Sequence, residues 1–181
     1  MRKIIGAINM TLDGIFDHNA GLPDEHIHRH YTRLLNEGDT VLYGRITYQL
    51  MEFWRSIREN PSEDDSMNEF ARSIDRIPKI VFSRTLKDVD WETASLATQG
   101  LEETALQLKQ QTGKVIYAGS RSIITQLLEM KLLDELQLCV YPVVEGNGMK
   151  LFDSIQEKLL LKLTGTRTFP SGAVVLHYIP M

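Results

Sequence analysis

Residues 115–128 constrain the fold most, because a short apolar run ends at a glycine and a helical pattern begins immediately after it. Residues 115–118 are typical of a buried strand, and the apolar residues that follow recur at helical spacing, namely Ile123, Ile124, Leu127 and Leu128. Gly119 permits a tight turn, and Ser120 and Ser122 are both candidates for the helix N-cap. The unpaired N–H groups of such a helix start can bind a phosphate, although an ordinary serine-capped turn is the simpler interpretation of this segment alone.

The same alternation of strand and helix runs through the first 134 residues. We expect strands at residues 3–10, 40–43, 79–82 and 115–118, a short one within 91–96, and helices beginning near residues 23, 45, 67, 101 and 120. The second helix is expected to run through Trp54, and the polar residues 55–66 to form an exposed loop. Beyond residue 134 the pattern changes to a long strand at 135–144 and a hairpin formed by 158–169 and 173–179. The sequence therefore predicts a single α/β domain over residues 1–181, with a parallel sheet and an antiparallel C-terminal part.

The charge and the single cysteine narrow the functional classes. A net charge of −4 and a pI of about 5.7 give no overall positive field that would attract nucleic acid. No apolar run approaches the roughly 18 residues of a membrane span, and no signal peptide is evident, so a cytoplasmic protein is expected. Cys139, the only cysteine, precludes an internal disulfide and is expected to be a buried thiol.

Three histidines in the first predicted helix are candidate metal ligands. His26 and His30 are four residues apart and would share a helix face, which is compatible with chelation. No obvious third ligand accompanies them, and the His-Glu pair typical of metalloproteases is absent. We therefore expect a solvated histidine cluster, including His28, and no metal site.

Three predicted strands are each followed by a turn that carries an arginine and a hydroxyl group. The pairs are Arg45 with Thr47, Arg84 with Ser83, and Arg121 with Ser120. Because the carboxyl ends of parallel strands lie at one edge of a sheet, we expect these groups to gather there and to suit a ligand with several phosphates. The arginine after the third strand could bind a ribose 2′-phosphate through both guanidinium nitrogens. The glycine-rich fingerprint of Rossmann folds is absent.

Several short motifs, taken in order, resemble the dihydrofolate reductase-like superfamily, and its branch that includes the C-terminal reductase domain of bacterial riboflavin biosynthesis. The motifs are Leu12-Asp13-Gly14, Gly44-Arg45-x-Thr47-Tyr48, Val81-Phe82-Ser83-Arg84-Thr85, Ala118-Gly119-Ser120, Leu133-Asp134-Glu135-Leu136, and Pro142 with Gly146-x-Gly148-x-x-Leu151-Phe152. The resemblance covers nearly the whole chain. It implies a three-layer fold, in which helices flank a mainly parallel eight-stranded sheet that ends in an antiparallel hairpin. It also implies that NADPH reduces a pterin, pyrimidine or ribosylated heterocycle, as in a 5-amino-6-(5-phosphoribosylamino)uracil reductase.

The resemblance also implies where the cofactor binds. Arg45 and Thr47 would lie near the phosphates, Ser83 and Arg84 at the 2′-phosphate, the turn at 119–121 around the pyrophosphate, and the loop at 12–14 beside the nicotinamide. The full set of expected cofactor-binding residues is Ala7, Leu12, Gly14, Gly44, Arg45, Thr47, Ser83, Arg84, Thr85, Ala118, Gly119, Ser120 and Arg121.

Two departures from the family pattern bear on activity. Ala118 replaces the first glycine of a Gly-Gly pair, and the substrate-binding acid of dihydrofolate reductase has no clear counterpart, although Asp24, Glu25 and His28 lie on the comparable helix. Asp13 is the expected catalytic group, with a plain Asp-Gly turn as the alternative. The expected function is an NADPH-dependent reductase of a small molecule. The alternatives are a non-catalytic NADPH-binding protein of the same fold and a purely structural or interaction protein, and a homodimer is possible.

Overall fold

A computed structural model describes residues 1–16, 21 and 23–181 of the chain. Its centre is one eight-stranded sheet with the order β4-β3-β2-β5-β1-β6-β8-β7. The strands are β1 (Ile4–Thr11), β2 (Gly38–Gly44), β3 (Lys79–Phe82), β4 (Ala94–Leu96), β5 (Val115–Ala118), β6 (Glu135–Tyr141), β7 (Leu161–Thr168) and β8 (Val174–Pro180). Every pairing from β4 to β6 is parallel, and β8 joins β6 and β7 antiparallel. The expected parallel sheet with an antiparallel C-terminal pair is confirmed.

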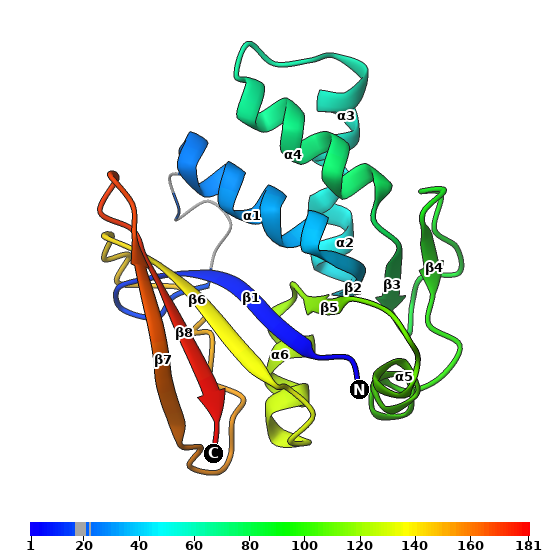
Figure 1. Cartoon of the computed structure of the whole chain (residues 1–181), viewed down its shortest axis with the longest axis vertical. Coiled ribbons are helices and arrows are strands. Elements are labelled where there is room, and N and C mark those ends of the chain that lie inside the picture. The colour runs from blue at the N-terminus through cyan, green and yellow to red at the C-terminus, as the bar shows by residue number, and fades with distance from the viewer. Residues whose placement is uncertain (17–20, 22) are drawn as a thin grey trace.

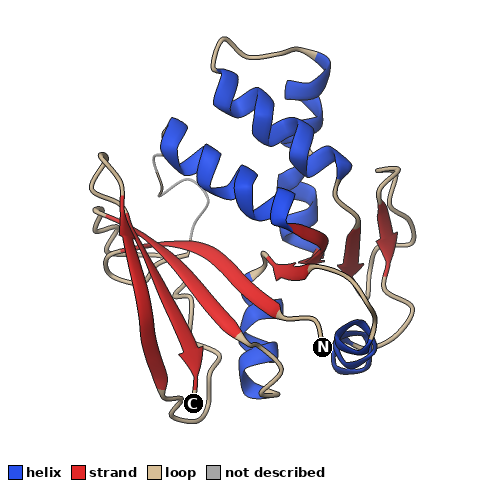
Figure 2. Cartoon of the chain, in the orientation of Figure 1, coloured by secondary structure: helices blue, strands red, loops and turns tan. Residues whose placement is uncertain are grey.

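Helices cover both faces of this sheet and give three layers (Figure 1 and Figure 2). They are α1 (Glu25–Glu37), α2 (Arg45–Met51), α3 (Phe53–Glu59), α4 (Asp65–Arg76), α5 (Leu101–Gln110) and α6 (Arg121–Glu129). The first four lie on one side of the sheet, and α5 and α6 on the other. None of the described helices is long and apolar enough to cross a membrane.

The alternation of side chains along β1 builds two separate cores. Ile4 and Ile8 pack on the side of α5 and α6, whereas Ile5 points to the opposite face and packs with residues of α1 and α4. Both faces are buried because the connections between parallel strands place helices on each side. Cys139 is buried as expected, and burial raises the pKa of its thiol to about 12, so it is an inert core residue.

The expectation of a loop at residues 55–66 is wrong in its first part. A second short helix, α3, starts at Phe53 and continues to Glu59, so that only residues 60–64 connect it to α4. Trp54 packs edge-on against Phe70 of α4, with ring centroids 4.5 Å apart. Arg55 and Arg58 form ion pairs with Asp90 and Asp75. These long-range contacts stabilise a helix that has no apolar periodicity of its own.

The expected solvated histidine cluster is wrong for two of its three members. His28 and His30 are both buried, whereas the side chain of His26 is 44% exposed. His30 lies edge-on between the rings of Tyr31 and Phe169. Helix α1 therefore buries more than one face. The turn between β7 and β8, which carries Phe169, covers the side of the helix where His30 lies.

Candidate functional site

The three arginine-bearing turns meet at one edge of the sheet. Strands β3, β2 and β5 are neighbours and parallel, so their carboxyl ends lie side by side. We call residues 44–47, 83–85 and 119–121 the carboxyl edge. Two of these turns are joined directly, because the Gly44 N–H donates a 2.8 Å hydrogen bond to Ser120 Oγ. A Cβ on Gly44 would lie 3.1 Å from Ser122 Oγ, which shows how closely the two turns approach.

Two helices begin at this edge without a capping side chain. Helix α2 follows Gly44, and α6 follows Ser120, but neither N-cap residue bonds to its own helix. Ser120 occupies the N-cap position that the sequence suggests, yet its hydroxyl is used to accept from Gly44, and Ser122 lies within α6. Among the described residues, the first N–H groups of these two adjacent helices are therefore left without a side-chain acceptor, an arrangement that favours anions.

The guanidinium groups of the three arginines differ in their contacts. Arg45 is exposed and bonds only to Gln49, at 3.1 Å, among the described residues. Arg84 is exposed and forms no ion pair with any residue that the structure describes. Ser83 Oγ accepts from the backbone N–H groups of Thr85 and Leu86, at 3.1 and 2.9 Å, and so shapes the turn that presents Arg84. Two arginines of the carboxyl edge are thus open to a ligand.

Arg121 is held by another part of the chain. Its Nε donates to the carbonyl oxygens of Lys150 and Leu151, at 3.0 and 3.3 Å, and its guanidinium pairs with Asp153. The side chain, which the sequence suggests for the cofactor pyrophosphate, is engaged in anchoring this loop. Only the backbone of Arg121 is free to face a phosphate in this arrangement.

The loop after β1 is fixed by the carboxylate of Asp13. Its oxygens accept from Thr11 Oγ1 at 2.6 Å and from the N–H groups of Gly146 and Glu145 at 2.8 and 3.2 Å. The Thr11 hydroxyl, followed by the Gly146 N–H, lowers the pKa of Asp13 to about 2. Asp13 is therefore a charged carboxylate at neutral pH, and the contacts favour its role as a turn residue over that of a proton donor.

Leu12 and Gly14, on either side of Asp13, are held in this loop by their backbone groups. Gly14 has a φ of +81°, which only glycine adopts without strain, and its carbonyl accepts from the Leu151 N–H. The backbone N–H of Leu12 donates to the carbonyl oxygen of Val143, and the residue is 66% exposed. The end of this segment, Phe16, lines the cavity described next. The expectation that the rest of this polar segment covers a site concerns residues 17–20 and 22, which lie outside the described part of the chain.

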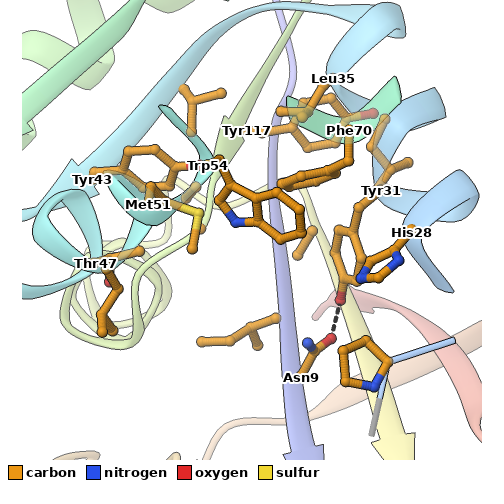
Figure 3. A pocket seen from close by; sticks show the side chains of 18 of the residues that line it. Asn9, His28, Tyr31, Leu35, Tyr43, Thr47, Met51, Trp54, Phe70 and Tyr117 are labelled. Atoms are coloured by element: carbon orange, nitrogen blue, oxygen red, sulfur yellow. Dashed lines mark hydrogen bonds between the residues drawn. The ribbon is translucent and has the colours of Figure 1, made fainter. Parts of the chain in front are cut away.

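A cavity of about 500 Å³ opens beside the carboxyl edge, between the sheet and helices α1 to α4 (Figure 3). Strands β1, β2 and β5 form its floor, and the helices form its walls. Four residues expected at the cofactor line it, namely Ala7, Thr47, Ala118 and Gly119. A Cβ on Gly119 would lie 2.7 Å from a ring carbon of Tyr43, so glycine allows this turn to pack against the cavity wall. The volume is typical of a small-molecule site.

Sequence reasoning missed most of the cavity wall, which is aromatic. Its rings come from several elements: Phe16, His28, Tyr31, Tyr43, Phe53, Trp54, Phe70 and Tyr117. Trp54 stands at the centre of this group, edge-on to His28, Phe53 and Phe70 at centroid distances of 5.7, 5.4 and 4.5 Å. The available signal was Tyr31 on the first predicted helix together with the aromatic pair at 53–54.

Two polar side chains stand out in this wall. The Tyr31 hydroxyl donates to Asn9 Oδ1, as Figure 3 shows. His28 Nδ1 lies 3.2 Å from Ser66 Oγ, and that hydroxyl itself donates to Asp64 at 2.7 Å. The imidazole is therefore the donor through Nδ1, which leaves Nε2 as an acceptor when the ring is neutral. Burial lowers the pKa of His28 and raises the pKa of Tyr31 well above its usual range, so both are uncharged at neutral pH.

The sheet order, the three layers and the open carboxyl edge beside a cavity define the class of dihydrofolate reductase-like domains. The chain belongs to the RibD C-terminal domain family, whose family model matches residues 2–175. It is 35% identical over 181 residues to the uncharacterized protein YyaP of Bacillus subtilis (strain 168), covering 98% of this chain and 94% of that protein.

Two solved structures establish the fold independently. One is a diaminohydroxyphosphoribosylaminopyrimidine deaminase/5-amino-6-(5-phosphoribosylamino)uracil reductase of Thermotoga maritima, with a TM-score of 0.66 and 14% identity over 99% of this chain and 57% of that chain. The other is the dihydrofolate reductase of Enterococcus faecalis in complex with NADP(H), with a TM-score of 0.61 and 14% identity over 98% of this chain and 96% of that chain. The resemblance noted in the sequence is thereby confirmed.

Proposed function

We propose that this protein is an NADPH-dependent reductase that transfers a hydride to a small heterocyclic molecule. The observation that carries the proposal is the junction of the β2 and β5 turns, where two helices without capping side chains start next to an aromatic cavity. Adjacent sets of unpaired N–H groups suit a pyrophosphate, and a neighbouring apolar cavity suits the rings attached to it.

The residues of the carboxyl edge would share the cofactor between them. The N–H groups that begin α2 and α6 would bind the pyrophosphate, together with Arg45 and the hydroxyl of Thr47. Arg84, presented by the turn that Ser83 and Thr85 shape, would bind the 2′-phosphate. The nicotinamide would enter the cavity over Ala7, beside Ala118 and Gly119.

The bound cofactor would supply the hydride, and the protein would hold the nicotinamide and the substrate ring next to each other. A reduction by NADPH also takes up one proton. No carboxyl group lines the cavity among the residues that the structure describes. In this proposal the proton therefore comes from water, and Asp13 has a structural role in the loop after β1.

Because no described residue of the cavity carries a carboxyl group, we keep a second candidate, a non-catalytic protein that binds NADPH. Two measurements on the purified protein separate the possibilities. Fluorescence titrations with NADPH and NADH test the shared cofactor site, and equal, very weak binding of both would contradict it. Oxidation of NADPH over a panel of pterins, pyrimidines and quinones tests the reductase, and tight binding without turnover on any of them would favour the second candidate.

The same proposal treats residues 1–181 as one catalytic domain that works in the cytoplasm. We also predict a homodimer formed through the C-terminal strands. Its basis is that β7 is an edge strand, whose outer backbone groups have no neighbouring strand in the sheet. Light scattering in solution would give the mass of one or of two chains.

A further inference from the structure

The cavity beside the proposed cofactor site contains no formal charge among its described lining residues. Its polar groups are the side chains of Asn9, His28 and Thr47, the hydroxyls of three tyrosines and the indole N–H of Trp54. The positions that the structure leaves undescribed, 17–20 and 22, are Asp, His, Asn, Ala and Leu in the sequence, so they add neither lysine nor arginine. Arg45 and Arg84 belong to the outer turns and do not line the cavity.

This composition discriminates between possible substrates. A phosphate or carboxylate moved into such a wall would lose its hydration without gaining a cation, which is strongly unfavourable. An uncharged ring loses little on transfer and gains contacts with the aromatic faces around Trp54, Phe70 and Tyr31.

The polar groups of the wall indicate what such a ring presents. Because Asn9 Oδ1 accepts from Tyr31, the amide nitrogen of Asn9 is left as a donor, and the structure records no partner for it among the described residues. His28 offers an acceptor at Nε2, because its Nδ1 is used by Ser66. A ring with a carbonyl or ring nitrogen and with an N–H or O–H group would satisfy both.

We propose that the cavity binds an uncharged, flat ring system of one or two cycles and excludes rings that bear a phosphate or carboxylate within it. The inference rests on the proposed function, since the ring would be the hydride acceptor. It sets this protein apart from reductases that act on phosphoribosylated pyrimidines, whose substrates carry an anionic group attached to the ring through a sugar.

A matched pair of pterins tests this inference by isothermal titration calorimetry. 6-Methylpterin and pterin-6-carboxylate share the ring and differ in charge. The wild-type protein should bind 6-methylpterin or a second neutral ring, 2-methyl-1,4-naphthoquinone, and should bind 6-methylpterin at least tenfold more tightly than the carboxylate. Equal or tighter binding of the carboxylate, or no binding of either neutral ring, would overturn the proposal.

Two variants locate the effect in the cavity. Met51→Lys places a cation in the wall at a partly exposed position, so it should reduce the difference in affinity between the two pterins. An unchanged difference in affinity would contradict the electrostatic argument. Trp54→Leu should weaken the binding of the neutral rings about tenfold. Trp91→Phe changes an aromatic residue outside the cavity and should leave this affinity unchanged. Similar losses in both tryptophan variants would place the rings elsewhere.

NADPH titrations of the same samples separate the two proposals. Tight NADPH binding without ring binding would refute only the inference on the cavity. Ring binding without NADPH binding would refute the reductase and leave the ring site standing.

Discussion

At the scale of single residues, Arg84 and Asp13 differ in whether their charged group already has partners in the fold. Arg84 is an exposed cation that no described acid neutralises, while Asp13 is an anion whose oxygens already accept three hydrogen bonds. The first is available to a ligand, and the second is committed to its own loop. The two residues therefore give different predictions on mutation.

Arg84→Ala should weaken the binding of NADPH without affecting the binding of NADH. Removing a charged donor to the 2′-phosphate should cost about 1.5–3 kcal/mol, or roughly a tenfold to hundredfold rise in Kd, because hydrogen bonds to charged groups have this strength. Fluorescence titration gives both affinities. Arg72→Ala, an exposed arginine on α4, is the matched control and should change neither. A parallel loss for NADPH and NADH would show that Arg84 does not bind the 2′-phosphate.

Asp13→Asn should lower stability but keep turnover, because an amide nitrogen cannot accept from the Gly146 N–H. The pKa of Asp13 in the folded protein, about 2, lies below its ordinary 3.8. The stabilisation is therefore present above about pH 4 and is lost as the pH falls toward 2. Denaturant unfolding of wild type and variant should show a constant difference above pH 5 that shrinks in acid. If turnover is found for the wild type, a loss of about a hundredfold or more in the variant would instead indicate acid catalysis.

At the scale of elements, the bond between Gly44 and Ser120 links the starts of α2 and α6. Ser120 is only 2% exposed, so its hydroxyl cannot be replaced easily by water. Ser120→Ala should lower the free energy of unfolding by about 1–3 kcal/mol, the cost of an unpaired buried group. It should also weaken NADPH and NADH to the same extent, because the pyrophosphate is common to both.

Ser95→Ala serves as the control for this element. Ser95 is an exposed serine on β4, and its loss should leave both stability and cofactor affinity within experimental error. Chemical denaturation and fluorescence titration measure the two effects. Unchanged stability in Ser120→Ala, or a loss of affinity for NADPH alone, would contradict the proposed role of this junction.

The elements also show why sequence reasoning found the carboxyl edge and missed the cavity. A strand that ends at Gly44 or Gly119 is a local pattern, and the topology of parallel strands then brings the turns together. The cavity depends on His28, Trp54 and Phe70, which come from three helices and meet only after packing. Likewise, Arg121 is an arginine at a strand end by its local pattern, but its partners lie about 30 residues further along the chain.

At the scale of the whole molecule, buried histidines make stability depend on pH. Burial, and then the charge of Arg167, lowers the pKa of His30 from 6.5 to about 4. Between about pH 6.5 and pH 4, His30 is therefore protonated in the unfolded chain but neutral in the folded protein. The free energy of unfolding should fall as the pH drops through this range, by up to about 3 kcal/mol from this residue.

His30→Leu should flatten this dependence. Denaturant unfolding between pH 7.5 and pH 4.5 gives the slope of the free energy of unfolding for the wild type and the variant. His26→Leu, at an exposed position of the same helix, is the control and should keep the wild-type slope. The same slope in all three proteins would mean that His30 does not remain neutral in the fold.

We propose that the carboxyl edge of β3, β2 and β5 holds NADPH with its nicotinamide directed into the aromatic cavity. A crystal structure of the protein with bound NADPH tests this most directly. We expect the pyrophosphate at the N-termini of α2 and α6, the 2′-phosphate on Arg84 and the nicotinamide over Ala7. NADPH bound on another face, or with its 2′-phosphate away from Arg84 and its nicotinamide outside the cavity, would contradict this cofactor site.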